Sequence, residues 1–343
     1  MKILLNGVGR IGKAIIRLSL KSTSFQIVAI NELNNNIENI AYTLNYDSTY
    51  GKIKDKFFVE DETIKNKHHC IKVLNYNSLL DIDFKNIGVD FVIDASGSKI
   101  DFDFLKRSSL KAIFLTHPSK DADINIVLGV NEKKLDIKKH KIISTSSCNA
   151  TALLPVLKLI DNKFKIKYGN ITTIHPLLNH QKVLDSSCVG SFNRDIECNY
   201  GFGRSSVQNI IPSKTTTIEA CSYVLDKIDQ KKISSSSFRV PTATVGAIDI
   251  LLCVKKSCDK KMIENLFLDY EKMQKYDILL NSYENMVSSD FQAERFTTII
   301  DHRFTNVNQH KMIKLNVWYD NEWGYASKVV DIVSLYNKKE KRI

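Results

Sequence analysis

Two residues that can carry out nucleophilic chemistry stand at favourable places in this sequence. Cys148 lies between an apolar strand and a helical pattern, so we expect it at the N-terminus of a helix. The dipole of such a helix favours the thiolate and lowers the pKa of the cysteine. A nucleophilic cysteine also needs a base, and His175 stands at the end of the apolar run 171–174. Spacing alone makes this pairing a modest hypothesis, because the chain has eight histidines and an isolated histidine is more often structural.

A second group of residues predicts a dinucleotide site. Gly7, Gly9 and Gly12 form the pattern GxGxxG after an apolar strand and at the start of a helical pattern. In such a site the glycines allow a tight turn, close approach of the backbone to a pyrophosphate, and helix–strand packing. Glu32 follows about 20 residues later, where a carboxylate binds the adenosine ribose hydroxyls and repels a 2′-phosphate. The pattern therefore predicts a site for NAD rather than NADP.

Hydrophobic periodicity separates an α/β first part from a strand-rich second part. In the first part, strands alternate with helical patterns, which favours a parallel sheet between helices. Its expected strands are 3–5, 27–30, 91–93, 113–115, 124–128 and 142–144, with helices at 10–20 and 150–161. The later expected strands are 171–174, 238–245, 247–254 and 312–318, followed by a helix at 322–336. Their β-branched and aromatic residues indicate a second, mainly antiparallel sheet, and the serine run 234–237 is expected in a loop.

Composition narrows the classes of protein further. The 343 residues are 43% hydrophobic and 25% charged, as in soluble globular proteins. The chain has no apolar run long enough to span a membrane and begins without a signal-peptide pattern, so a cytoplasmic location is expected. Seven cysteines without a CxxC pair suggest neither a metal site nor a disulfide framework, and all except Cys148 are expected to be small buried side chains.

The net charge of +11 is compatible with nucleic acid, a phosphate-bearing ligand or a solvated basic surface. The lysines are dispersed in short runs such as 139–141 and 338–341. This dispersion favours the solvated surface and makes nucleic-acid binding an unfavoured interpretation.

Six motifs, in order along the chain, resemble the glyceraldehyde-3-phosphate dehydrogenase family, which includes the erythrose-4-phosphate dehydrogenases. These motifs are residues 6–12, 146–148, 172–175, 208–212, 238–242 and 318–325. The resemblance runs from Lys2 to Asp331. It implies a Rossmann-type NAD-binding domain of residues 1–147 plus the returning C-terminal helix at 321–343. Residues 148–320 would form an α+β catalytic domain on the mainly antiparallel sheet.

The resemblance also implies roles for individual residues. Cys148 would attack a phosphorylated aldehyde, and His175 would accept its proton and hold it as a thiolate beforehand. NAD would be bound by Gly7, Gly9, Arg10, Ile11, Gly12, Glu32, Ser96, Ser119 and Asn321. The substrate phosphate and inorganic phosphate would be bound by Ser147, Asn149, Thr215, Arg239 and His180. In an expected homotetramer, the long loop 181–206 would approach the cofactor of a neighbouring subunit.

The sequence departs from the family pattern near both anion sites. Asn149 replaces a threonine that contacts attacking phosphate, although an amide can still donate. Leu178 replaces a threonine that binds the substrate phosphate, Lys214 adds a positive charge, and the loop 181–206 is longer than usual. A phosphorylating triose enzyme and an erythrose-4-phosphate dehydrogenase therefore both stay open, with the triose enzyme slightly favoured. A nucleotide- or RNA-binding relative without catalysis is a third interpretation, which the retained Cys148 and His175 oppose.

Overall fold

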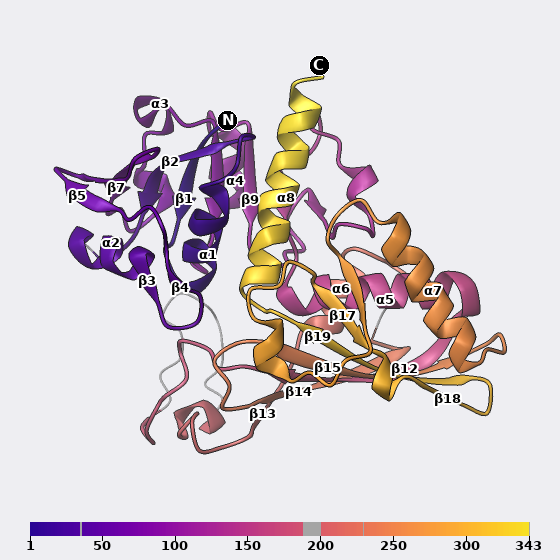
Figure 1. The fold of residues 1–343 in the computed structure, drawn as a ribbon. Coiled ribbons are helices and arrows are strands. Elements are labelled where there is room, and N and C mark those ends of the chain that lie inside the picture. The colour runs from indigo at the N-terminus through magenta and orange to yellow at the C-terminus, as the bar shows by residue number, and fades with distance from the viewer. Residues whose placement is uncertain (35, 188–199, 229, 343) are drawn as a thin grey trace. The chain divides into compact units, whose positions relative to one another are not determined.

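The computed structural model describes residues 1–34, 36–187, 200–228 and 230–342 (Figure 1). Packing divides the chain into two compact units. The first comprises residues 1–126, 133–146 and 326–343, and the second comprises 127–132 and 147–325. Contrary to the predicted nucleotide-binding domain of residues 1–147 and 321–343, the second unit also contains residues 127–132, 147 and 321–325.

The described part of the first unit contains a nine-stranded sheet in the order β10-β11-β9-β8-β1-β2-β7-β6-β5. Its parallel strands are β10 (Ile124–Asn125), β11 (Ile142–Ser144), β9 (Ala112–Leu115), β8 (Phe91–Asp94), β1 (Lys2–Asn6), β2 (Gln26–Asn31) and β7 (Cys70–Leu74). The edge strands β6 (Thr63–Lys65) and β5 (Phe58–Glu60) run antiparallel. The predicted Rossmann-type sheet is confirmed.

Helices accompany this parallel sheet, as its nearly continuous apolar strands require. They are α1 (Arg10–Ser19), α2 (Ile37–Asn45), α3 (Phe84–Ile87), α4 (Phe102–Arg107) and α8 (Trp323–Glu340). A short hairpin of β3 (Tyr46–Asp47) and β4 (Gly51–Lys52) follows α2. The expected strand 124–128 is shorter than predicted, because pairing ends at Asn125 although residues 126–128 stay buried.

The second unit is built on an eight-stranded sheet in the order β13-β14-β12-β15-β19-β17-β16, with β18 paired to β19 in the described residues. The strands are β12 (Ile166–His175), β13 (Ile211–Ser213), β14 (Ile233–Arg239), β15 (Gly246–Val254), β16 (Leu279–Ser282), β17 (Thr298–Asp301), β18 (Asn306–Asn308) and β19 (Met312–Tyr319). Most pairs are antiparallel, as predicted; β12–β14 and β16–β17 are parallel. The helices are α5 (Cys148–Phe164), α6 (Thr217–Ser222) and α7 (Lys260–Met273) (Figure 1).

The serine run 234–237 forms most of β14, so its prediction as a loop is wrong. β14 lies between β12 and β13 and pairs with both through its backbone. On the open face of the sheet, Asn170 donates to the Ser234 hydroxyl at 2.9 Å. The predicted strand 238–245 is also misplaced, because β14 ends at Arg239, two residues before Pro241, which has no N–H for a sheet ladder.

The cysteines fit their predicted burial only in part. Cys221 and Cys258 are buried, whereas Cys70 is exposed on the strand β7 and Cys253 is half-buried on β15. Cys188 and Cys198 lie outside the described residues. The expectation of burial is therefore wrong for Cys70, because alternate side chains of a strand face solvent when that side of the sheet is uncovered.

None of the helices in the described residues combines the length and the apolarity needed to cross a bilayer.

Candidate active site

The glycine motif forms a tight turn between β1 and α1. Gly7 has φ +89°, and a Cβ at this position would lie 2.6 Å from the Ser96 Cα. A Cβ at Gly12 would lie 2.1 Å from the Gly7 carbonyl oxygen, so only glycine lets α1 approach the strand. A Cβ at Gly9 would meet no atom within 4 Å. The turn therefore leaves open space at its centre, where a phosphate group can approach the backbone.

Glu32 and Ser96 reach the same turn from the ends of the two strands that flank β1. The carboxylate of Glu32, just after β2, accepts the Val8 N–H at 2.7 Å. The Ser96 hydroxyl, just after β8, donates to Asp94 Oδ1 at 2.7 Å, and Asn6 donates to the same oxygen at 2.7 Å. The carboxyl ends of the parallel strands thus bring the sequence-predicted residues together at one edge of the sheet, where nucleotides bind in such folds.

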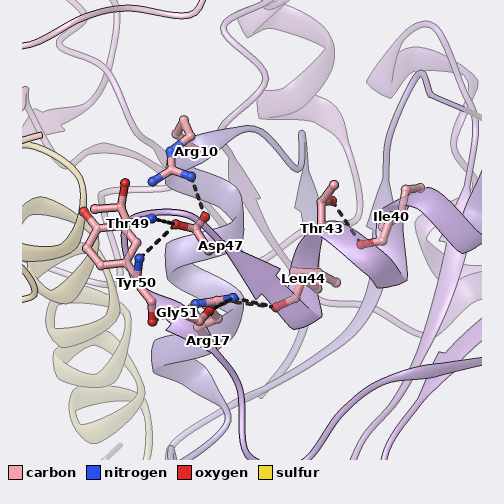
Figure 2. Close-up of polar contacts among 9 residues, drawn as sticks. All are labelled: Arg10, Arg17, Ile40, Thr43, Leu44, Asp47, Thr49, Tyr50 and Gly51. Carbon is pink, nitrogen blue, oxygen red and sulfur yellow. Dashed lines mark hydrogen bonds and ion pairs between the residues drawn. The ribbon is translucent and has the colours of Figure 1, made fainter. Parts of the chain in front are cut away.

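Arg10 opens α1 beside the β3–β4 hairpin. Its guanidinium ion-pairs with Asp47 and lies over the ring of Tyr50, 5.5 Å from the centroid (Figure 2). Arg17, about two turns further along α1, fixes the hairpin. Its guanidinium donates to the carbonyls of Leu44 and Gly51 at 2.9 Å (Figure 2). Burial lowers the pKa of Arg17, and the nearby Asp47 opposes this shift.

The sequence-predicted thiol and imidazole lie together in the second unit. Helix α5 begins at Cys148 because the Ser147 hydroxyl accepts the Ala150 N–H at 3.2 Å and caps the helix. His175 ends β12, and its Nε2 lies 3.8 Å from Cys148 Sγ. The other ring nitrogen, Nδ1, lies 2.9 Å from the Pro176 carbonyl and must donate to it. Nε2 of the neutral ring is then the acceptor that faces the thiol.

Burial determines the protonation of this pair. It raises the pKa of the Cys148 thiol to about 11, with the Arg239 charge opposing the shift. Burial, and secondly Arg239, lowers the pKa of His175 to about 3. The predicted lowering of the Cys148 pKa is therefore wrong. The pair rests as thiol and neutral imidazole, because loss of solvation outweighs the Arg239 charge and the backbone hydrogen bonds that favour the thiolate.

Arg239 is the cation beside this pair. It lies opposite His175 in the parallel β12–β14 register, so both side chains stand at the carboxyl ends of neighbouring strands. Its Nε and Nη1 atoms are buried and lack hydrogen-bond partners among the described residues. A buried guanidinium without acceptors is costly, and a bidentate anion is the group that best satisfies its planar fork.

Asn149 connects the thiol to a chain of polar side chains. Its Oδ1 accepts from the buried Tyr319 hydroxyl at 2.6 Å and lies 3.6 Å from Cys148 Sγ. Its Nδ2 donates to the Thr217 hydroxyl at 3.1 Å, which lies 2.7 Å from the Thr215 hydroxyl. The predicted anion residues Asn149 and Thr215 therefore belong to one network.

Asn321 supports a strained backbone turn. Val245 has φ +66°, which is unfavourable for a β-branched residue. Asn321 Oδ1 holds this turn by accepting from the Val245 N–H at 3.1 Å and the Thr244 hydroxyl at 3.2 Å. This arrangement orients the buried Asn321 amide, so that its NH₂ group is the end directed away from the turn.

Several predicted residues have other local partners. The exposed His180 ring lies edge-on to the Phe202 ring, with 5.3 Å between the ring centroids. Ser119 pairs through its backbone with the Asn125 amide, and Lys214 is exposed. The backbone N–H of Leu178 donates to Gln181 Oε1 at 2.8 Å. Of the predicted functional loop 181–206, residues 188–199 lie outside the described part of the chain.

Several polar residues that hold the predicted ones have no role assigned from the sequence. These residues are Asn6, Asp47, Asp94, Thr217, Thr244 and Tyr319. Asp94 ends a buried apolar strand, and a carboxylate at the carboxyl end of a parallel strand is a signal that could have identified it. Tyr319 lies within the motif 318–325, but its bond to Asn149 has no local signal, because 170 residues separate the two.

Comparisons with known proteins agree with this geometry. Residues 1–101 match the NAD-binding domain of glyceraldehyde 3-phosphate dehydrogenase, and residues 147–321 match the C-terminal domain of the same enzyme. The chain is 30% identical over 336 residues to glyceraldehyde-3-phosphate dehydrogenase 2 of Bacillus subtilis, covering 97% of this chain and 96% of the relative. It is 32% identical over 335 residues to the Priestia megaterium enzyme of this name, covering 97% of each.

The two domain matches and the near full-length relatives together show the family. The chain belongs to the glyceraldehyde-3-phosphate dehydrogenase family, whose members are NAD-dependent oxidoreductases acting on the aldehyde group of a phosphorylated sugar.

Proposed function

We propose that the protein oxidises glyceraldehyde 3-phosphate with NAD and inorganic phosphate, through a covalent intermediate on Cys148. The observation that carries this proposal is the unpartnered guanidinium of Arg239 beside the Cys148–His175 pair. A thiol, a neutral base and a buried cation are what a phosphorylated aldehyde needs for nucleophilic attack and binding.

The resting protonation state defines the first step. Because the thiol is protonated and His175 is neutral, Cys148 gives its proton to Nε2 as Sγ bonds to the aldehyde carbon. His175 returns that proton to the former carbonyl oxygen, which completes a thiohemiacetal. The Nδ1 bond to Pro176 keeps Nε2 facing the reacting atoms throughout.

Oxidation then converts the thiohemiacetal into a thioester. NAD, when bound, supplies the acceptor for the hydride that leaves this carbon. His175 takes the hydroxyl proton, and the carbonyl forms again on the sulfur. Phosphate attacks the thioester carbon, the S–C bond breaks, and the proton on His175 returns to Cys148. Asn149 and Thr215 are the residues that we assign to the attacking phosphate.

The first unit offers the features that NAD needs. The open space at Gly9 admits a pyrophosphate, and Arg10 and Ile11 begin α1 at this turn. A helix N-terminus is a favourable place for a phosphate group. Glu32 lies at this turn and would accept from the adenosine ribose hydroxyls. We assign Ser96 and Ser119 to the lining of this site, and the Asn321 amide to the nicotinamide carboxamide.

Leu178 favours a second candidate, the oxidation of erythrose 4-phosphate with water as the acyl acceptor. Its side chain cannot donate, and its backbone N–H is already bonded to Gln181. A lost bond to a charged group costs about 1.5–3 kcal/mol, which weakens binding of the triose phosphate about tenfold or more. His180 would have to compensate for this loss in the triose enzyme.

A substrate panel distinguishes these candidates. We expect NADH formation from glyceraldehyde 3-phosphate that requires inorganic phosphate, and Leu178→Thr should lower its KM. Phosphate-independent turnover of erythrose 4-phosphate would instead support the second candidate. Absence of NADH from both aldehydes would contradict both candidates and favour the non-catalytic interpretation.

His175→Asn should lower kcat by roughly 10²–10⁴-fold, the usual effect of removing a positioned base.

We further propose that the protein is a homotetramer in the cytoplasm. Helices α5 and α6 pack on the second sheet and leave one of its faces uncovered. This open face carries exposed apolar side chains, namely those of Tyr168, Ile174, Phe238, Leu251 and Met312. An apolar sheet face of this kind is typical of contacts between subunits, and a second copy of the chain is the occupant that a symmetric oligomer supplies.

A further inference from the structure

Four polar side chains beside Cys148 come from three parts of the second unit. Asn149 is the second residue of α5, and Tyr319 is the last residue of β19. Thr217 is the first residue of α6, and Thr215 lies two residues before it. Helix α5 packs against both α6 and β19 (Figure 1). We name these four side chains the Asn149 network.

The Tyr319 hydroxyl sets the orientation of the Asn149 amide. Burial raises the pKa of Tyr319 well above its ordinary value, so the hydroxyl keeps its proton. A buried hydroxyl proton needs an acceptor, and Asn149 Oδ1 lies 2.6 Å from the Tyr319 oxygen. The oxygen of the amide therefore faces Tyr319. Its NH₂ group then faces Thr217, and Asn149 Nδ2 donates to the Thr217 hydroxyl at 3.1 Å.

The direction of the next bond follows from the burial of Thr217. This residue is only 3% exposed, so its hydroxyl proton also needs an acceptor inside the protein. Among the described residues, the Thr215 hydroxyl oxygen lies 2.7 Å away and is the acceptor that this proton meets. Thr217 therefore donates to Thr215, and it is too deeply buried to contact a ligand itself.

Thr215 stands at the end of this series of bonds. Its oxygen accepts the Thr217 hydroxyl and also the Thr217 backbone N–H at 3.2 Å. A hydroxyl has two acceptor positions and one proton. Both acceptor positions of Thr215 are thus used within the network, and its own proton is left to donate. Thr215 is half-buried, so it can present this proton to a ligand.

The four bonds all point in one direction, from Tyr319 through Asn149 and Thr217 to Thr215. Each donor in such a series polarises the next one, by about 10–30% per bond. The charged oxygens of phosphate are strong acceptors for such a donor. We propose that Thr217 is a positioning residue, which turns the Thr215 hydroxyl toward the phosphate that attacks the Cys148 thioester. This inference rests on the proposed function, because the attacking phosphate is part of that function.

Thr217→Val tests the inference, because it removes the hydroxyl and keeps the shape of the side chain. The Thr215 proton is then no longer held in one direction. The KM for inorganic phosphate should rise about tenfold or more, the usual effect of losing a hydrogen bond to a charged group. The KM for glyceraldehyde 3-phosphate should be unchanged. Thr217→Ser keeps the hydroxyl and should restore the low KM for phosphate, which a role in packing alone does not predict.

Rapid mixing without phosphate separates the two halves of the reaction. Hydride transfer precedes the attack of phosphate, so NAD and glyceraldehyde 3-phosphate should give a burst of NADH stoichiometric with the active sites. The unmodified protein and Thr217→Val should give the same burst. Only the later phase, which depends on phosphate, should be slower in Thr217→Val.

A double-mutant cycle with Thr215→Val completes the test. If Thr217 acts through Thr215, adding Thr217→Val to Thr215→Val should not raise the KM for phosphate further, whereas independent effects would multiply. Multiplying effects, an unchanged KM for phosphate in Thr217→Val, or failure of Thr217→Ser to restore it would overturn the inference alone. A missing burst or phosphate-independent turnover in the unmodified protein would instead overturn the proposed function, and the inference with it.

Discussion

At the scale of single residues, the charge state of Cys148 is the main departure from expectation. A helix N-terminus predicts a thiolate, but burial raises the pKa of Cys148 to about 11 and lowers that of His175 to about 3. The reactive thiolate would then form only as the proton moves to His175 during attack. The family mechanism is compatible with this state, because proton transfer and S–C bond formation can be coupled.

Alkylation of the ligand-free protein tests this charge state. The thiol loses its proton as pH rises toward 11, so the rate of Cys148 labelling by iodoacetamide should rise about tenfold per pH unit between pH 7 and 10. Peptide mapping identifies the labelled cysteine, and Cys148→Ser is the control. A labelling rate that is already maximal at pH 7 would show that a thiolate is present at rest.

Glu32 should determine cofactor choice, because its carboxylate lies at the glycine turn and would repel a 2′-phosphate. The protein should use NAD in preference to NADP, and Glu32→Ala should narrow this preference by raising KM for NAD. Initial rates with both cofactors measure the ratio. If the ratio is unchanged in Glu32→Ala, the carboxylate serves only to bind the Val8 N–H.

At the scale of elements, Arg17 joins α1 to the β3–β4 hairpin that faces Arg10. Its planar fork reaches two carbonyls that a lysine cannot satisfy with the same geometry. Arg17→Lys should lower the free energy of unfolding by about 1–3 kcal/mol and raise KM for NAD more than it lowers kcat. Arg107→Lys, at an exposed arginine of the same unit, should change neither quantity. Equal effects of both substitutions would contradict a specific role of the Arg17 bonds in stability and NAD binding.

Gly246 lets the neighbouring strands place Tyr319 against Asn149. A Cβ at this position would lie 2.7 Å from the Tyr319 ring, so Gly246→Ala should displace the ring and cost about 1–3 kcal/mol in stability. We expect it to lower kcat more than Tyr319→Phe does, because Tyr319→Phe removes only the hydroxyl. Chemical denaturation and steady-state kinetics measure both effects. A fully stable and active Gly246→Ala would mean that the strands shift to accommodate the methyl group.

At the scale of the whole molecule, the open face of the second sheet should mediate assembly. The double substitution Tyr168→Glu and Leu251→Glu places charges on this face, and light scattering should then report a smaller particle than for the unmodified protein. Met262→Glu, on an exposed position of α7, is the control and should leave the mass unchanged. A particle of monomer mass before any substitution would contradict the proposed homotetramer.

The sequence by itself determined the features that depend on neighbouring residues. The glycine spacing, the apolar strands of the first sheet and the helix start at Cys148 follow from local sterics and periodicity, and the structure contains all three. Boundaries were less predictable where a partner strand decides them. The run 234–237 became a strand because β12 and β13 pair with it on both sides, and serine itself has little preference for this state.

Only the tertiary structure decided the interactions between residues that are distant in the chain. Burial reversed the expected pKa shift of Cys148, because desolvation depends on every element packed around the thiol. The bond between Tyr319 and Asn149 has the same origin. Charge and periodicity can be counted along a chain, but the distance between two side chains is set by how the whole chain packs.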